Sequence, residues 1–216
     1  MPELIPEFET WEDFNDFLLE ATSLDLHSLA VKHTDCWSNQ ALCEEEEMLW
    51  DEGDNLDEVV FIRVVGAQNV SEQTLRYILE CGSPNTEWRA VLSNAIMSSP
   101  AITSEILTLI PVDDYVNDGV VAFEMFFHQL ANLDVISHIT SDGLGISDIV
   151  DLAATEKFGG VGLETNWHQR NKYRQDVLLR MQAKWDEVSK EGRVPSQDEI
   201  ESIPEVITYL LTKSSE

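Results

Sequence analysis

The feature that most constrains the fold is a pattern that recurs three times in the middle of the chain. It divides this stretch into three blocks, residues 54–83, 84–113 and 114–143. Each block opens with acidic or polar residues and continues with an apolar run, a short polar break, a second apolar run and a turn. A self-similar period of this length is the signature of stacked helical hairpins. Stacking is required because one hairpin cannot bury both of its apolar faces by itself.

The breaks between the two apolar runs carry the clearest local signals. Each contains an apolar residue, and these residues follow one another at intervals of 32 and 31 positions: Val70, Ile102 and Leu133. Ser71 and Thr103 stand where a helix N-cap belongs, because a hydroxyl there accepts a hydrogen bond from an otherwise unpaired backbone N–H. The pattern therefore predicts that the second helix of a hairpin begins directly after its break.

One run in the first block has the composition of a strand. Residues 59–65 are β-branched or aromatic apart from Arg63, which in isolation is typical of a buried β-strand. We nevertheless predict a helix there, because the corresponding runs of the other two blocks are richer in Ala, Leu and Met.

With these breaks and the leucine-type runs that follow them, residues 54–143 resemble variant leucine-rich and HEAT-like helical repeats. Proteins with such repeats bind other proteins or nucleic acids, and some repeats serve only as a scaffold. The resemblance therefore implies a short α-solenoid with a binding or scaffolding role. The residues leave one alternative open, an irregular helical bundle whose elements happen to be evenly spaced.

The chain as a whole is predicted to be all-α, with helical-hairpin repeats flanked by N-terminal helices, a long C-terminal helix and short helices. Thr10 is the expected N-cap of the first helix, with Asp13 three residues on as the partner of a capping box. A long amphipathic helix is expected from Thr165 to about Lys190. The predicted segments are an acidic helical cap (1–53), three helix-pair repeats (54–143), a Gly-containing connector (144–164) and a C-terminal helical segment packed on the same body (165–216).

The charge of the chain is strongly negative and unevenly distributed. Of the net charge of −28, residues 1–150 carry −25, from 29 acids and 4 bases, and residues 151–216 carry −3, from 12 acids and 9 bases. Such a field repels nucleic acids and anionic membrane surfaces. It attracts basic proteins and speeds their encounter with the chain.

The most acidic stretch also contains large apolar residues, which makes it the predicted partner-binding site. Aromatic anchors surrounded by charge contribute a disproportionate share of interface energy. The alternative is a solvated helix face with Leu49 and Trp50 turned inward. The predicted partner-binding residues are Glu44, Glu45, Glu46, Glu47, Trp50, Asp51, Glu52, Asp54, Asp57 and Glu58.

The long C-terminal helix carries the basic surface of the chain. Two interpretations stay open: its cations pack against an acidic surface, of this chain or of a second copy in a homodimer, or they form an ordinary solvated face. The residues concerned are His168, Arg170, Lys172, Arg174, Arg180 and Lys184.

No familiar catalytic or cofactor-binding motif is present, so no catalytic residue, metal or cofactor is predicted. A zinc site would need ligands in close pairs, and the candidate set lacks that spacing: His27, His33, Cys36 and Cys43. Residues 114–125 resemble a calcium loop only in part, because Val116 and Met125 stand where oxygen ligands are needed. His128 and His138 lie in apolar runs and are expected to be structural rather than catalytic.

The expected compartment is the cytoplasm. Three cysteines make a disulfide framework unlikely to be the basis of the fold, and the first residues lack the basic and apolar regions of a signal peptide. No run of 18 apolar residues that would span a bilayer is present.

The sequence thus predicts an acidic protein-binding module that docks on a basic partner, such as a nuclease, a toxin or a nucleic-acid-binding complex, and blocks it. Toxin-immunity proteins and DNA-mimic inhibitors use this physics, since dense carboxylates imitate a phosphate array. One alternative is a helical-repeat scaffold that binds a peptide in its groove, with the charge serving solubility. The other is an enzyme of unrecognised class, whose site residues lie far apart in the sequence.

Overall fold

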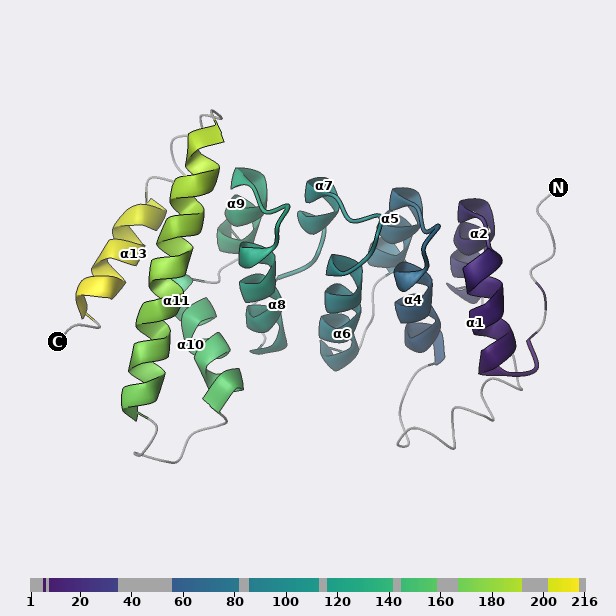
Figure 1. Cartoon of the computed structure of the whole chain (residues 1–216), viewed down its shortest axis with the longest axis horizontal. Helices are drawn as coiled ribbons and strands as arrows, with labels where there is room; N and C mark the ends of the chain where they lie inside the picture. The colour runs from purple at the N-terminus through teal and green to yellow at the C-terminus, as the bar shows by residue number, and fades with distance from the viewer. Residues whose placement is uncertain are drawn as a thin grey trace. The chain divides into compact units, whose positions relative to one another are not determined.

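The computed structural model of the chain is all-helical over the residues that it describes, which confirms the all-α part of the predicted fold class (Figure 1). The chain divides into two compact units, residues 1–109 and 110–216, hereafter unit 1 and unit 2. The described residues are 6, 8–34, 56–81, 86–112, 116–141, 145–158, 167–191 and 202–213.

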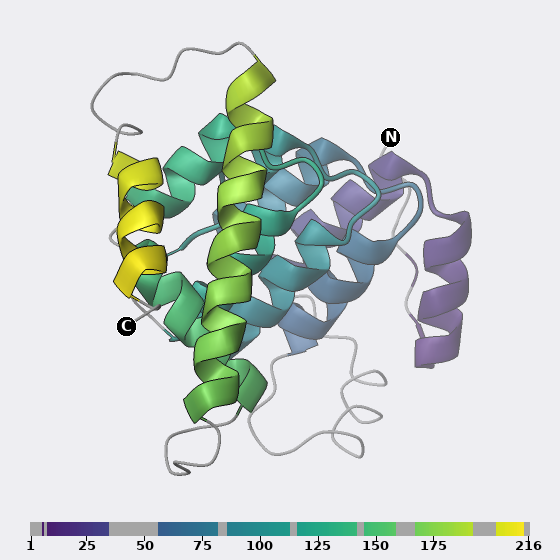
Figure 2. The same ribbon diagram turned by 60° about the vertical axis from the view of Figure 1, so that its left-hand side comes forward.

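Unit 1 consists of helices that pack on neighbours close to them in the sequence. α4 contacts α2, α5 and α6, and α5 also contacts α2 and α7 (Figures 1 and 2). The described helices of this unit are α1 (Trp11–Glu20), α2 (Ser23–Thr34), α4 (Leu56–Gly66), α5 (Glu72–Cys81), α6 (Thr86–Met97) and α7 (Ser104–Leu107).

Unit 2 is built around α8 and α11. α8 contacts α9, α10 and α11, and α11 also contacts α10 and α13, so the long helix packs on the third block of the sequence (Figure 2). The described elements are α8 (Val116–Phe127), α9 (Leu133–Ser141), α10 (Ile146–Phe158), α11 (Trp167–Val188) with a 3-10 turn (Ser189–Glu191), and α13 (Ser202–Lys213).

The strand-like run of the first block is helical, as predicted, and its burial explains its composition. Val60, Val64 and Val65 are fully buried, and Val59 and Phe61 are nearly so. α4 contacts three neighbouring helices, and its described side chains are buried except for the half-buried Ile62 and Arg63 and the exposed Gly66. A helix buried over most of its surface loses its amphipathic pattern, which is why the sequence of α4 looks like that of a buried strand.

The predicted cap of the first helix is present. Thr10 Oγ1 accepts a hydrogen bond from Asp13 N–H at 3.1 Å and donates to the Asp13 carboxylate at 2.9 Å. Trp11, Phe14 and Leu18 are buried at helical spacing, so α1 turns one face to the unit and the other to solvent.

The three turns that join α4 to α5, α6 to α7 and α8 to α9 have the same backbone hydrogen bonds. In each turn the first residue donates to the carbonyl three positions earlier, and its own carbonyl accepts from the residue three positions later. The donor–acceptor pairs are Ala67–Val64 and Val70–Ala67, Ser99–Ile96 and Ile102–Ser99, and His128–Met125 and Ala131–His128.

An N-cap side chain follows each of these turns. Ser71 and Thr103 accept the predicted hydrogen bonds, at 3.3 Å from Thr74 N–H and 3.2 Å from Ile106 N–H. In the third turn the cap is Asn132, whose Oδ1 accepts from Val135 N–H at 3.1 Å.

The alignment of Leu133 with Val70 and Ile102 is therefore wrong by two positions. Ala131 occupies the equivalent place in the third turn, and Leu133 is already the first residue of α9. Both Ala131 and Leu133 are buried, so an apolar residue in the break does not by itself define the register.

α7 is shorter than the second apolar run of its block. The helix ends at Leu107, and Thr108 to Ile110 form a turn. Pro111 follows, and a proline disfavours helical backbone in the residue before it. Ile110 and Val112 are nonetheless buried, so the run contributes to the core without being helical.

Two glycines offer opposite tests of helix stability. Gly66 is the exposed last residue of α4, and an added Cβ there meets nothing within 4 Å. We expect Gly66→Ala to raise the free energy of unfolding by about 0.5–1 kcal/mol, because alanine loses less backbone entropy on folding. Urea denaturation followed by circular dichroism measures the change.

Gly145, at the N-terminus of α10, is the control for that prediction. A Cβ there would lie 2.8 Å from Asp148 Oδ2, the carboxylate oxygen that accepts the Gly145 N–H at 3.0 Å. We expect Gly145→Ala to be destabilising, since alanine is a poor N-cap. Equal effects of the two substitutions would contradict this account.

Candidate partner-binding surface

Most of the predicted partner-binding site lies outside the described residues. This holds for Glu44 to Glu47, Trp50, Asp51, Glu52 and Asp54. Asp57 and Glu58 lie in the first turn of α4, where the structure describes the backbone but not their side chains. The acidic stretch therefore stays a prediction. The acidic surface that the structure describes in unit 1 is formed by other residues.

The described surface with the densest exposed carboxylates is the outward face of α1. Glu12, Asp13, Asp16 and Glu20 are all exposed, and they lie opposite the buried Trp11 side of the helix. At about 100° per residue, the four side chains fall within about 100° of arc on the helix surface. We call these four residues the α1 carboxylate row.

The spacing of the α1 carboxylate row approaches that of a nucleic-acid strand. Its four acids occupy the nine residues from Glu12 to Glu20. At a rise of about 1.5 Å per residue the three intervals between these acids average about 4 Å of helix axis, whereas a DNA strand carries one phosphate per about 3.4 Å. The linear charge density of the row is thus slightly below that of one strand of a duplex.

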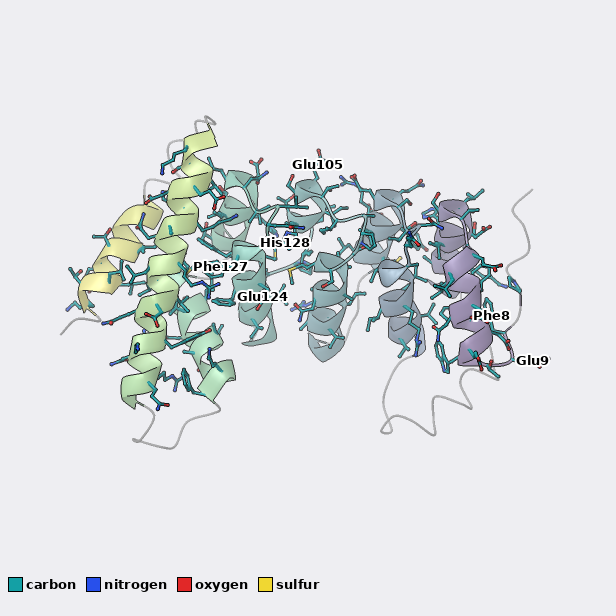
Figure 3. The ribbon with its side chains drawn as sticks, in the orientation of Figure 1. Phe8, Glu9, Glu105, Glu124, Phe127 and His128 are labelled. Carbon is teal, nitrogen blue, oxygen red and sulfur yellow. The ribbon has the colours of Figure 1, made fainter. Side chains whose placement is uncertain are left out.

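Contacts from two directions hold α1 in place. Arg63 of α4 lies over the Trp11 ring, 4.4 Å from its centroid, and donates to Asn15 Oδ1 at 3.0 Å. Phe8, which precedes the helix, packs against the rings of Phe14 and Phe17 at centroid distances of 5.1 and 5.2 Å (Figure 3). The row is therefore displayed on a helix that is anchored on its other face.

Three acidic residues on the other helices of unit 1, Asp25, Glu72 and Glu105, are engaged within the unit. Arg76 donates to Glu72 of its own helix at 2.6 Å and to Glu105 of α7 at 2.7 Å. The hydrogen bond to Glu72 raises the pKa of the Arg76 guanidinium above its ordinary value. In α2, hydrogen bonds from Thr22, first from its side chain and then from its backbone, lower the pKa of the Asp25 carboxyl.

The α1 carboxylate row differs from these acids. Within the described ranges, no cation forms an ion pair with Glu12, Asp16 or Glu20. Two strongly exposed leucines lie close by in the sequence, Leu19 at 73% and Leu24 at 66% exposure. Charge that is not used for internal pairing is available to a partner, which makes this face the candidate surface in the described part of unit 1.

No protein-family model, curated protein or solved structure matches this chain.

Several cations of α11 are used inside unit 2. Arg174 forms an ion pair with Asp151 of α10 at 2.9 Å, and Arg170 donates to Thr155 of the same helix. Arg180 lies over the Phe127 ring, 4.4 Å from its centroid. Lys172 is exposed. Of these cations, Arg174 pairs with an acid of unit 2 and Lys172 faces solvent, whereas pairing with a second copy stays a prediction. The side chain of His168 lies outside those described.

The histidines expected to be structural have hydrogen-bond partners. His138 Nε2 lies 2.7 Å from the Ile110 carbonyl oxygen, and His128 Nδ1 accepts from Leu130 N–H at 3.1 Å. Of the zinc candidates, His27 contacts Gln73 and Thr74 of α5. His33 lies in α2 but its side chain is not described, and Cys36 and Cys43 lie outside the described residues.

The described residues contain no group of three or more metal-binding side chains. None of the helices within the described ranges is both long enough and apolar enough to cross a lipid bilayer.

Proposed function

We propose that this chain is an acidic binding protein that docks on a basic partner protein and blocks it, in the manner of an inhibitor, an immunity protein or a DNA mimic. The observation that carries the proposal is the α1 carboxylate row, which is exposed, is free of ion pairs with described cations and has a charge spacing close to that of a nucleic-acid strand. A partner that binds phosphates through Lys and Arg presents the complementary charge.

The distribution of charge between the units supports the same proposal. Unit 1 contains 22 acids and 4 bases, a net charge of −18, and unit 2 contains 19 acids and 9 bases, a net charge of −10, which together give −28. A field of this sign and size accelerates encounter with basic proteins. The negative charge per residue is larger in unit 1, which carries the α1 carboxylate row.

We also propose that the hairpins form a short α-solenoid. The support is the shared geometry of the three turns and the packing of α4 on α6 and of α5 on α7, which joins corresponding helices of successive hairpins. Ser99 at the end of α6 donates to the Val65 carbonyl of α4 at 2.6 Å. In a stacked array, neighbouring repeats bury the faces that one hairpin leaves open.

A tagged version of the protein, incubated with lysate of the cells that produce it, tests the proposed function. Captured proteins are identified by mass spectrometry at about 0.05 M and about 0.5 M salt, because screening at the higher concentration weakens exposed charge pairs. The expected result is a basic protein that is retained stoichiometrically at low salt and released at high salt. Its own activity, nuclease or nucleic-acid binding, is expected to fall when the acidic protein is added.

The alternatives predict different results from the same experiment. A partner that stays bound at both salt concentrations would favour a scaffold that holds a peptide through apolar contacts. A basic partner that is retained but keeps its full activity would contradict the inhibitory part of the proposal.

A further inference from the structure

The turn between α8 and α9 is closed by a histidine ring. The backbone N–H of Leu130 donates to His128 Nδ1 at 3.1 Å, beside the two backbone hydrogen bonds of the turn. His128 is half-buried and follows directly after Phe127, the last residue of α8 (Figure 3). Because Nδ1 accepts this bond, the ring must be neutral and must carry its proton on Nε2.

The α6–α7 turn of unit 1 contains the same kind of side-chain hydrogen bond, accepted by a different residue. In the α6–α7 turn, Ser99 takes the place of His128, and the Ala101 N–H donates to Ser99 Oγ at 3.4 Å. Both turns thus hold the backbone N–H two residues on with a side-chain acceptor. A serine hydroxyl keeps its lone pairs at every physiological pH, whereas histidine is the side chain that ordinarily changes charge between about pH 5 and 8.

The hydrogen bonds of the other two histidines with described side chains, His138 and His27, can still form when the imidazole ring is protonated. His138 Nε2 donates to the Ile110 carbonyl oxygen at 2.7 Å, and a second proton on the ring leaves that donor in place. His27 Nε2 lies 3.4 Å from the Gln73 side-chain nitrogen, and a glutamine amide can rotate to present its oxygen instead. The backbone N–H of Leu130 can only donate, so no rotation restores its bond to a protonated His128.

We propose that the α8–α9 turn is a pH-sensitive switch operated by His128. Protonation at Nδ1 replaces the acceptor of the Leu130 N–H by a second donor. The two N–H groups then face one another, and the turn loses the hydrogen bond between the Leu130 N–H and the His128 ring.

The charged groups around the turn come from each helix that packs on α8. Glu124 lies one helical turn before His128 on α8 (Figure 3), Asp134 lies in the first turn of α9, and Arg180 of α11 is held over Phe127. On α10 the described charges are engaged away from the ring: Asp148 with the Gly145 N–H, Asp151 with Arg174, and Lys157 over Tyr173.

Nuclear magnetic resonance of the whole 216-residue chain tests the switch. Its ring resonances report the protonation of His128, and hydrogen exchange reports the protection of the Leu130 amide, corrected for the intrinsic exchange rate. Between a pH at which the ring resonances show His128 to be neutral and a pH at which they show it to be protonated, we expect this protection to fall about fivefold, the effect of losing one net hydrogen bond. The Ala101 amide, in the serine-containing turn, serves as the internal control.

Two variants separate titration from simple loss of a side chain. His128→Asn places a carbonyl oxygen at the position of Nδ1, and asparagine forms such turns readily, so Leu130 protection is expected to be the same at both pH values. His128→Ala removes the acceptor, so protection is expected to be low at both. The proposal is overturned if His128 stays neutral at every pH at which the protein is folded, or if it becomes protonated and Leu130 protection changes no more than that of Ala101.

Discussion

Replacing Glu12, Asp16 and Glu20 by Gln, Asn and Gln is expected to slow association with the basic partner about tenfold or more at low salt, and to flatten the dependence of the rate on salt. The side chains are exposed on α1, so the change removes charge without removing packing. Charges at such positions act mainly on the association rate by steering encounter. Stopped-flow or surface plasmon resonance at a series of salt concentrations measures both quantities.

A second charge variant distinguishes the α1 carboxylate row from the acidic stretch that the sequence predicts as the binding site. It neutralises the predicted acidic stretch at Glu44 to Glu47, Asp51 and Asp54, which lies outside the described residues. If the α1 carboxylate row is the binding surface, this variant will change the rate only through the overall field, and dissociation will be unaffected. If the stretch is the site, it will weaken binding more than the α1 variant does.

The matched control neutralises three exposed acids of α11 in unit 2: Asp176, Asp186 and Glu187. It removes the same number of charges as the α1 variant, so a general effect of net charge will appear equally in both. An unchanged rate and salt dependence in all three variants would show that the negative charge serves solubility and that a groove-binding scaffold is the better description.

The largest effect on stability is expected from Leu178→Ala in α11. Leu178 is 2% exposed and lies on the face of the helix that packs into unit 2, beside the buried Val177 and Met181. Truncating a fully buried leucine loses its transfer free energy and leaves a cavity, which together lower the free energy of unfolding by about 2–5 kcal/mol. Urea denaturation monitored by circular dichroism measures this loss.

The next residue provides a control with the same chemical change. Leu179 is 57% exposed, so Leu179→Ala changes neither the core nor the helix propensity by much, and we expect its effect to stay within about 0.5 kcal/mol. Comparable losses at the two positions would mean that α11 does not pack on unit 2 through the face containing Leu178.

Local signals in the sequence predicted the helices and their starting points well. The hydroxyls of Thr10, Ser71 and Thr103 cap helices as expected, because a cap depends on the residues directly around it. The third cap, Asn132, was not predicted. The apolar Leu133 resembles Val70 and Ile102 of the other two breaks, and this likeness shifts the third turn by two positions. Pro111 was a readable signal for the early end of α7, since its effect on the preceding residue is also local.

Contacts between distant parts of the sequence could not be predicted in this way. The position of Arg63 over Trp11 joins residues that are 52 positions apart, and nothing in the local pattern of either residue indicates the other. His128 looked like a core histidine because it follows an apolar run. Its role as the acceptor of the Leu130 N–H depends on the backbone path of the turn, which periodicity does not specify.

The burial of most of the described side chains of α4 affects how unit 1 folds. Its run of valines, isoleucine and phenylalanine has high β-propensity, which makes it prone to intermolecular strand pairing whenever it is exposed. The helices that cover it, α2, α5 and α6, are its near neighbours in the sequence, so contact order is low and folding is expected to be fast. During synthesis, however, α6 emerges after α4, and the segment is a site of aggregation until that helix arrives.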